Sequence, residues 1–294
     1  MAGAQKGCGH VGGESPARTD TSKRDRPHCL IVAEVGNVHE GSLGNCHAFI
    51  DAVAEAGVDA VKFQCHVASQ ESSPQEGWPK RFSFHPQDDT RQGYWRRMEF
   101  DRREWSMLCH RAAACNLKFI VTPFCIEAIE RCRGFPNYWK IGSGQVSNKR
   151  LLMEVQREPE DVILSTGMST TEEILDANRL CFPKFILQCT TEYPCPPEQI
   201  GLSELRPLIN GLSDHGGTIW PSIIAAYLGA EMIEVHVCWD KRQFGADVSS
   251  SVTIDELKQL VEGVRFAERM GPIDKDAVTA GLSDARVYVE GKNV

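Results

Sequence analysis

From residue 29 onward the sequence repeats one alternation, in which a short run suited to a β-strand is followed by a longer stretch with helical periodicity. Strands are predicted at Cys29–Val35, Ala60–Gln64, Lys118–Thr122, Tyr138–Ile141, Asp161–Ser165, Lys184–Cys189, Ile209–Ser213 and Met232–His236. The predicted helices include Leu43–Ala56, Asp101–Cys115, Thr170–Leu180, Pro221–Gly229 and Thr253–Met270. Eight strands, each followed by a helix, predict a closed parallel (β/α)8 barrel, or TIM barrel.

A doubly wound open sheet is the alternative architecture. Such a sheet usually has fewer strands, and it often carries a glycine-rich dinucleotide loop after the first of them. The end of the first predicted strand and the loop after it have the sequence AEVGNVHEG, which does not match GxGxxG. The sequence therefore favours the barrel.

Three segments fall outside this alternation. Residues 1–27 are polar and lack the apolar core of a secretory signal, so they are predicted to be a disordered tail before a barrel domain at 28–272. Residues 273–294 are predicted to be a C-terminal tail. Residues 65–100 form an insertion too long for a plain connection. It is expected either to cover the mouth of the barrel or to be a surface Ω-loop.

Composition excludes several classes of protein. The net charge of −8 argues against a nucleic-acid-binding surface, and no apolar run approaches the ~20 residues that a membrane span needs. The 12 cysteines lack CxxC spacing, and several lie in apolar strand-like runs, where a thiol behaves as a small hydrophobic group. We therefore expect reduced thiols and a cytoplasmic protein.

Two histidines are the strongest candidates for chemistry. His215 follows the seventh predicted strand and His236 ends the eighth, so both imidazoles are expected at the same end of neighbouring parallel strands. Either histidine alone would be explained by a hydrogen bond in the core. Together they predict a divalent-metal site.

Two lysines lie within apolar strands. Burying Lys62 and Lys140 is costly unless negative charge compensates them, so two lysines aimed at one cavity imply a polyanionic ligand. The turn at Ser165–Gly167, which opens the next helix, would add backbone N–H groups to an anion cradle. The alternative is that each lysine pairs with a glutamate such as Glu34 or Glu234.

Other polar and aromatic residues collect where the predicted strands end, which is where barrel enzymes place their reacting groups. They are Gln64, Thr122, Phe124, Ser143, Tyr193 and Ser213. Asp247 follows the last strand and could bind substrate hydroxyls, although a surface loop aspartate is the default interpretation of it. His39 is better explained as a structural hydrogen-bonding residue.

With these residues in view, the chain resembles the sialic acid synthase family, the N-acetylneuraminate synthases and their relatives. The resemblance runs from about residue 30 to residue 270. It rests on IVAEVGNVHEGSLG, GVDAVKFQ, FIVTPF, YWKIGSGQVSN, VILSTGMST, ILQCTTEYPCPPE, GLSDHGGT and EVHVCWD followed by FGADVSSS. These motifs occur in the family's order and at consistent spacing.

The resemblance implies a condensation of phosphoenolpyruvate with the aldehyde of an N-acyl mannosamine-type sugar, giving a nonulosonic (sialic-type) acid and phosphate. The residues that would hold phosphoenolpyruvate are Lys62, Thr122, Lys140, Ser143, Ser165, Gly167 and Ser213. Gln64, Tyr193 and Asp247 would hold the sugar, with Phe124 against it. His215 and His236 would bind Mn2+ or Mg2+, and Glu34 and Lys62 would complete the catalytic group.

The chain also departs from the family pattern. Gln145 stands where an acidic residue is common, Glu192 stands where an asparagine is common, and DVSSS lacks a customary histidine. The family's C-terminal antifreeze-like (SAF) domain, which caps the partner's barrel in a homodimer, is not found before Val294. The resemblance thus implies a homodimer and leaves room for a separate SAF-domain partner. Two alternatives stay open: a phosphoenolpyruvate-dependent synthase for another aldehyde, and a non-catalytic ligand-binding paralogue.

Overall fold

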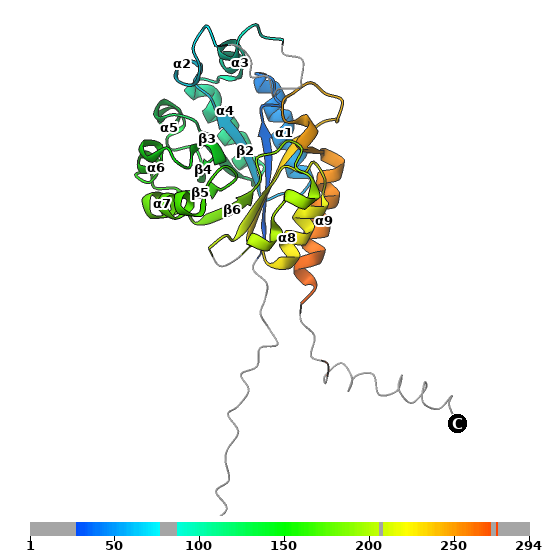
Figure 1. Ribbon diagram of the computed structural model, residues 1–294. Coiled ribbons are helices and arrows are strands. Elements are labelled where there is room, and N and C mark those ends of the chain that lie inside the picture. Colours follow the sequence, from blue (N-terminus) through cyan, green and yellow to red (C-terminus); the bar gives the residue numbers. More distant parts are fainter. Residues whose placement is uncertain (1–27, 77–86, 206–207, 272–274, 276–294) are drawn as a thin grey trace, which may run out of the picture. The chain divides into compact units, whose positions relative to one another are not determined.

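Eight parallel strands close into a barrel, because β1 pairs with β8 as well as with β2 (Figure 1). They are β1 (Leu30–Gly36), β2 (Ala60–Cys65), β3 (Lys118–Pro123), β4 (Tyr138–Ile141), β5 (Asp161–Ser165), β6 (Phe185–Cys189), β7 (Gly211–Asp214) and β8 (Met232–Cys238). A short β9 (Ser251–Thr253) pairs with the end of β8. The predicted (β/α)8 barrel is confirmed, and each predicted strand is found within two residues of its expected bounds.

This computed structural model describes residues 28–76, 87–205, 208–271 and residue 275. Arg26–Met270 form one compact unit, which holds the barrel. Met1–Asp25 and Gly271–Val294 form a second unit, nearly all of it outside the described residues. The predicted tails, 1–27 and 273–294, therefore lie outside the described residues, apart from Lys275.

Helices cover the outside of the sheet (Figure 1). They are α1 (Leu43–Glu55), α4 (Arg102–Ala114), α5 (Ile126–Cys132), α6 (Lys149–Val155), α7 (Thr171–Cys181), α8 (Trp220–Leu228) and α9 (Ile254–Arg269). Reciprocal capping boxes begin α4, α7 and α9. In each, the side chain of an Asp or Thr N-cap accepts from the N–H of a Glu three residues later, and that Glu side chain accepts from the N–H of the N-cap. Local sequence therefore fixes where these helices begin.

The connection between β6 and β7 differs from the expected pattern of one helix after every strand. In its described part it holds only two 3-10 turns, η2 (Pro197–Gln199) and η3 (Leu202–Glu204). The run EYPCPPEQ explains the difference, since each proline lacks an N–H donor and restricts the residue before it to extended conformations.

The inner face of the barrel changes character along its axis. At the amino ends of the strands it is apolar, and the side chains that fill it are Val32, Ala60, Ile120, Ile163, Phe185, Leu187 and Met232. Side chains of a strand alternate between its two faces, so the next inward positions come two residues later. On most strands those positions are polar or charged, which puts the site at the carboxyl end.

The insertion at 65–100 contains two further helices, α2 (Ala68–Glu71) and α3 (Arg91–Met98). Figure 1 shows both beyond the carboxyl ends of the strands. Arg97 of α3 forms an ion pair with Glu40 in the loop after β1, at 2.6 Å. The insertion is thereby joined to the loops around the mouth. Its aromatic residues Trp78, Phe82 and Phe84 lie outside the described residues.

Every cysteine in the described part of the chain is a free thiol, as predicted, and most of these cysteines are buried. Burial raises the pKa of the Cys29 thiol to about 12, which keeps it protonated and unreactive. Within the described residues, none of the helices is long and apolar enough to cross a membrane.

Candidate active site

A layer of buried polar side chains lies above the apolar layer of the barrel, and the two-residue period of the strands places it there. It consists of Glu34, Lys62, Thr122, Lys140, Ser165, Ser213 and Glu234. Each comes from a different strand, and the closure of the barrel pairs β1, which carries Glu34, with β8, which carries Glu234. The sequence predicted all of these residues as site or partner residues, and the fold brings them together.

Both lysines form buried ion pairs with glutamates, which is the alternative that the sequence left open. Lys62 Nζ lies 2.9 Å from Glu34 Oε2 and 3.3 Å from Glu234 Oε1. Lys140 Nζ lies 2.6 Å from Glu234 Oε2. Glu234 therefore bridges the two lysines, and the four side chains contain equal numbers of acidic and basic groups.

The two lysines are compensated unequally. Burial disfavours the charge of Lys62, but the carboxylates of Glu234 and Glu34 outweigh burial and raise its pKa. Burial lowers the pKa of Lys140, because its one close carboxylate does not offset the loss of water and the nearby Lys62 opposes its charge. Lys140 is thus the cation that would gain more from an incoming anion.

Hydroxyl and backbone groups surround these lysines. Thr122 Oγ1 accepts a hydrogen bond from Lys62 at 3.1 Å, and Ser143 Oγ accepts one from the Gly167 N–H at 3.0 Å. The buried Ser165 hydroxyl has no hydrogen-bond partner among the described residues. A Cβ added to Gly167 would lie 2.4 Å from Thr191 Oγ1, so the close turn requires glycine. The arrangement suits an anion.

The two predicted histidines face each other at the mouth, with ring centroids 5.3 Å apart. His215 Nδ1 lies 2.9 Å from the Thr190 carbonyl oxygen, so Nδ1 carries the hydrogen that this contact needs. The other nitrogen, Nε2, is left as an acceptor and faces the Tyr193 hydroxyl at 3.1 Å. The Tyr193 ring stacks on His215 at 4.2 Å.

These imidazoles fit a divalent cation in two respects. Burial, followed by the neighbouring His215, lowers the pKa of His236, which favours the neutral form that binds metals. His236 Nδ1 is buried without a hydrogen-bond partner among the described residues. That part of the chain contains no group of three or more His, Cys, Asp or Glu side chains arranged for a metal. The protein would therefore supply the two imidazoles and leave the other positions to water or substrate.

Residues predicted to hold the sugar lie around the same mouth. Gln64 Nε2 donates to Glu34 Oε1 at 2.7 Å, which ties Gln64 to the charged layer. Asp247 Oδ2 is buried without a hydrogen-bond partner among the described residues, and a Cβ on Gly36 would come within 3.0 Å of it. Phe124 stacks on His66, with ring centroids 4.5 Å apart.

The sequence reasoning missed two residues near Gln64. His66 lies 3.1 Å from Gln64 Oε1 through Nε2, and Asn37 Nδ2 lies 3.5 Å from the same oxygen. The signal for His66 was present, because Lys62, Gln64 and His66 follow each other at the two-residue period of one strand face. His39 is structural, as expected. Its Nδ1 accepts from the Gly41 N–H at 3.0 Å, and burial lowers its pKa to about 3.

The two residues that depart from the family pattern lie away from the lysines. Gln145, in the 3-10 turn η1 (Ser143–Gln145), accepts a hydrogen bond from Asn148 at 2.9 Å. Glu192 is exposed in the loop after β6. The ion pairs of the charged layer are formed by Glu34, Lys62, Lys140 and Glu234 and do not involve either residue.

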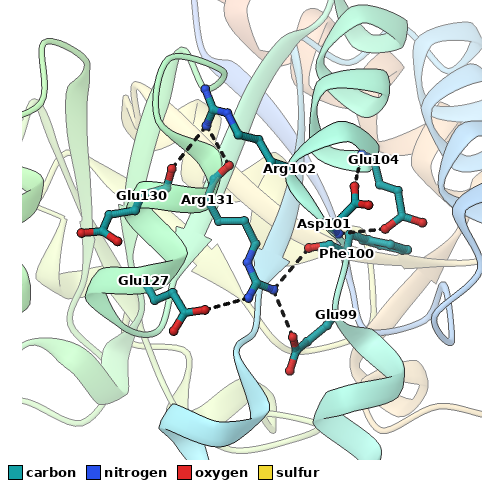
Figure 2. Close-up of a pocket in the computed structure, with 8 residues that line it drawn as sticks. All are labelled: Glu99, Phe100, Asp101, Arg102, Glu104, Glu127, Glu130 and Arg131. Atoms are coloured by element: carbon teal, nitrogen blue, oxygen red, sulfur yellow. Dashed lines mark hydrogen bonds and ion pairs between the residues drawn. The ribbon is translucent and has the colours of Figure 1, made fainter.

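A cavity of about 570 Å³ lined by charged residues lies outside the barrel between α4 and α5 (Figure 2). Figure 2 shows Arg131 held by Glu99, Glu127 and the Phe100 carbonyl oxygen. Arg102 donates to the carbonyl oxygens of Glu130 and Arg131. Both guanidinium groups are already bonded to the protein, and the cavity is separate from the predicted site residues.

Comparison with known proteins gives consistent matches. The sequence model of the NeuB family matches residues 49–273. The N,N'-diacetyllegionaminic acid synthase of Campylobacter jejuni is 33% identical over 82% of this chain and 76% of its own length. The human N-acetylneuraminate-9-phosphate synthase is 29% identical over 82% of this chain and 70% of its own. The crystal structure of the sialic acid synthetase of Leptospira borgpetersenii has a TM-score of 0.76 at 24% identity, covering 88% of this chain and 92% of its own.

Glu234→Gln should destabilise the protein in a pH-dependent way. Burial works against ionisation of this carboxyl, but Lys140 and Lys62 outweigh it and lower the pKa of Glu234 from an ordinary 4.5 to about 2. Its stabilisation is therefore complete above pH 4.5 and is lost as the pH falls through about 2. We expect a loss of about 3 kcal/mol in the free energy of unfolding at pH 7, measured with urea, and a smaller loss below pH 4.5.

Glu231→Gln is the matched control, since Glu231 is exposed just before β8 and its side chain accepts a hydrogen bond from Asn210 rather than pairing with a buried lysine. It should change the free energy of unfolding by less than about 0.5 kcal/mol at every pH. Equal losses for the two variants, or a Glu234 loss that grows as the pH falls, would contradict the prediction.

Proposed function

Because the chain belongs to the NeuB family, we propose that it is a phosphoenolpyruvate-condensing synthase of a nonulosonic acid. The acceptor is an N-acyl mannosamine-type sugar aldehyde, and the second product is phosphate. Two relatives are named as synthases of N,N'-diacetyllegionaminic acid and of N-acetylneuraminate 9-phosphate, which supports this substrate class.

One observation carries the proposal: Lys140 is buried with its charge incompletely compensated, and the same polar layer holds the Ser165 hydroxyl, which has no hydrogen-bond partner among the described residues. Lys140 shares its only close carboxylate, that of Glu234, with Lys62. Ser165 Oγ, on the neighbouring strand β5, offers a further donor. A phosphate and a carboxylate on one small molecule would supply additional negative charge for Lys140 and hydrogen-bond acceptors for such donors. Phosphoenolpyruvate carries these two groups.

In the proposed reaction, C3 of phosphoenolpyruvate forms a bond to the aldehyde carbon. Water adds at C2, and phosphate leaves with cleavage of its C–O bond. The lysines stabilise the anionic groups throughout. Burial raises the pKa of Glu34 despite the opposing effect of Lys62, which makes this carboxyl a better proton acceptor than an exposed glutamate. We assign Glu34 the proton transfer to or from the acceptor.

His215 and His236 would hold Mn2+ or Mg2+, in line with the acceptor nitrogen of His215 and the unpartnered nitrogen of His236. When bound, the ion would act as a Lewis acid toward the aldehyde. Gln64, Tyr193 and Asp247 would orient the sugar around it. The tyrosine hydroxyl that faces His215 would then be free to bond to the acceptor.

We further propose a homodimer that works in the cytoplasm, where its buried thiols stay reduced. A cap over the mouth would come from a SAF domain, for which a separate chain is one source. Light scattering of the purified protein should give twice the 32.7 kDa mass of the chain. A monomer at all protein concentrations would contradict the dimer.

Phosphate release from phosphoenolpyruvate tests the activity. The assay contains Mn2+ and one acceptor at a time: N-acetylmannosamine, its 6-phosphate, a 2,4-diacetamido hexose, arabinose 5-phosphate or erythrose 4-phosphate. We expect release that requires an acetamido sugar and stops when EDTA removes the metal. His215→Ala should abolish release while the protein stays folded.

The other outcomes would each replace the proposal. Release with only arabinose 5-phosphate or erythrose 4-phosphate would establish a synthase for a different aldehyde. No release, together with a rise in melting temperature on adding phosphoenolpyruvate and Mn2+, would favour a non-catalytic ligand-binding protein.

Lys140→Met should raise the KM for phosphoenolpyruvate by tenfold or more, because it removes a charge of the anion cradle and keeps the length of the side chain. The KM for the acceptor should change much less. Lys184→Met is the control, since Lys184 is half exposed and pairs with Asp161 outside the site. An unchanged KM for phosphoenolpyruvate in Lys140→Met would exclude the assigned role.

A further inference from the structure

We propose that His66 is a positioning residue, which fixes the amide of Gln64 so that its N–H groups face Glu34 and the acceptor sugar. The inference rests on the proposed function for its kinetic consequence. Its structural basis, however, is independent of any reaction. His66 follows β2 directly and is 2% exposed.

The ring of His66 is held on both faces and at both nitrogens. Trp95 of α3 stacks on one face and Phe124 on the other, with centroid separations of 4.0 and 4.5 Å and interplanar angles of 16°. Glu71 Oε2, from α2, lies 2.8 Å from Nδ1. Glu71 is itself fixed, because its Oε1 accepts from the Val67 N–H at 2.6 Å. The ring therefore cannot turn without breaking several contacts.

The remaining nitrogen of His66 determines which way the amide of Gln64 points. Gln64 Oε1 lies 3.1 Å from His66 Nε2 and 3.5 Å from Asn37 Nδ2. Gln64 Nε2 lies 2.7 Å from Glu34 Oε1. The two ends of an amide differ, since one only accepts and the other only donates. Because Glu71 Oε2 and Gln64 Oε1 only accept, both ring nitrogens of His66 carry a hydrogen in this arrangement. Gln64 then presents its N–H groups to the carboxylate of Glu34.

Two consequences for the site follow from this orientation. One N–H of Gln64 bonds to Glu34, and the second is available to an oxygen of the acceptor, such as a hydroxyl or an acyl carbonyl. If the amide turned over, its oxygen would face the Glu34 carboxylate, and two acceptors would repel. The insertion at 65–100 thereby acts on the barrel, because Glu71 and Trp95 hold the histidine that holds Gln64.

A pair of amide substitutions separates positioning from packing. In His66→Gln the side-chain amide reaches as far as imidazole Nε2, and it can keep the bond to Gln64. In His66→Asn the amide reaches only as far as Nδ1, so it can keep the bond to Glu71 but not the one to Gln64. Both variants lose the stacked ring, and their melting temperatures should fall by similar amounts.

We expect kcat/KM for the acceptor to fall about tenfold in His66→Asn and to stay within about threefold of wild type in His66→Gln. The KM for phosphoenolpyruvate should be unchanged in both. Equal losses in the two variants, in proportion to their melting temperatures, would show that His66 only packs.

Crystal structures of the two variants test the inference without turnover. The Gln64–Glu34 hydrogen bond should be lost in His66→Asn and kept in His66→Gln. An intact bond in His66→Asn would overturn the inference, even if the wild-type protein is active. Conversely, a wild-type protein that releases no phosphate would overturn the proposed function and leave this structural result to stand by itself.

Discussion

The structure depends on one buried set of charges, in which Glu234 bridges Lys62 and Lys140 while Glu34 pairs with Lys62. These four side chains replace apolar packing across the upper half of the barrel. Removing any one would leave a buried charge uncompensated, which costs far more than losing an exposed pair. The positions of the strands that carry them, β1, β2, β4 and β8, are therefore constrained by charge as well as by backbone hydrogen bonds.

Strand register links these charges to the histidines. Glu34 lies opposite Lys62 on β2 and opposite His236 on β8. Because inward side chains recur every second residue, a slip of one residue in β8 would turn both Glu234 and His236 out of the barrel. The apolar layer below, with Val32 and Met232 on the same two strands, opposes such a slip. The packing that stabilises the fold thus also sets the geometry of the site.

Sequence periodicity was enough to predict the barrel and the residues on its inner face, because both follow from local alternation along each strand. It could not decide whether Lys62 binds an external anion or a glutamate, since that depends on distances between strands far apart in the chain. The position of His66 on the face of Lys62 and Gln64 was visible in the sequence, but its contacts were not, because Glu71 and Trp95 come from two helices of an insertion with no strand pattern. Three nearby prolines in the sequence indicated that an α-helix after β6 was unfavourable. The prediction relied on the alternation of strands and helices and did not take these prolines into account.

The connection between β6 and β7 makes one side of the site differ from the other. The lysines and glutamates lie on strands covered by packed helices, so a change in chain length there would disturb the core. The segment after β6 begins with Thr190 and Tyr193, which contact His215, and continues through two 3-10 turns with no α-helix in its described part. Lengthening or shortening such a segment costs mainly loop-closure entropy. The barrel can therefore diversify the molecules it admits at one side of the mouth while its buried charges stay where they are.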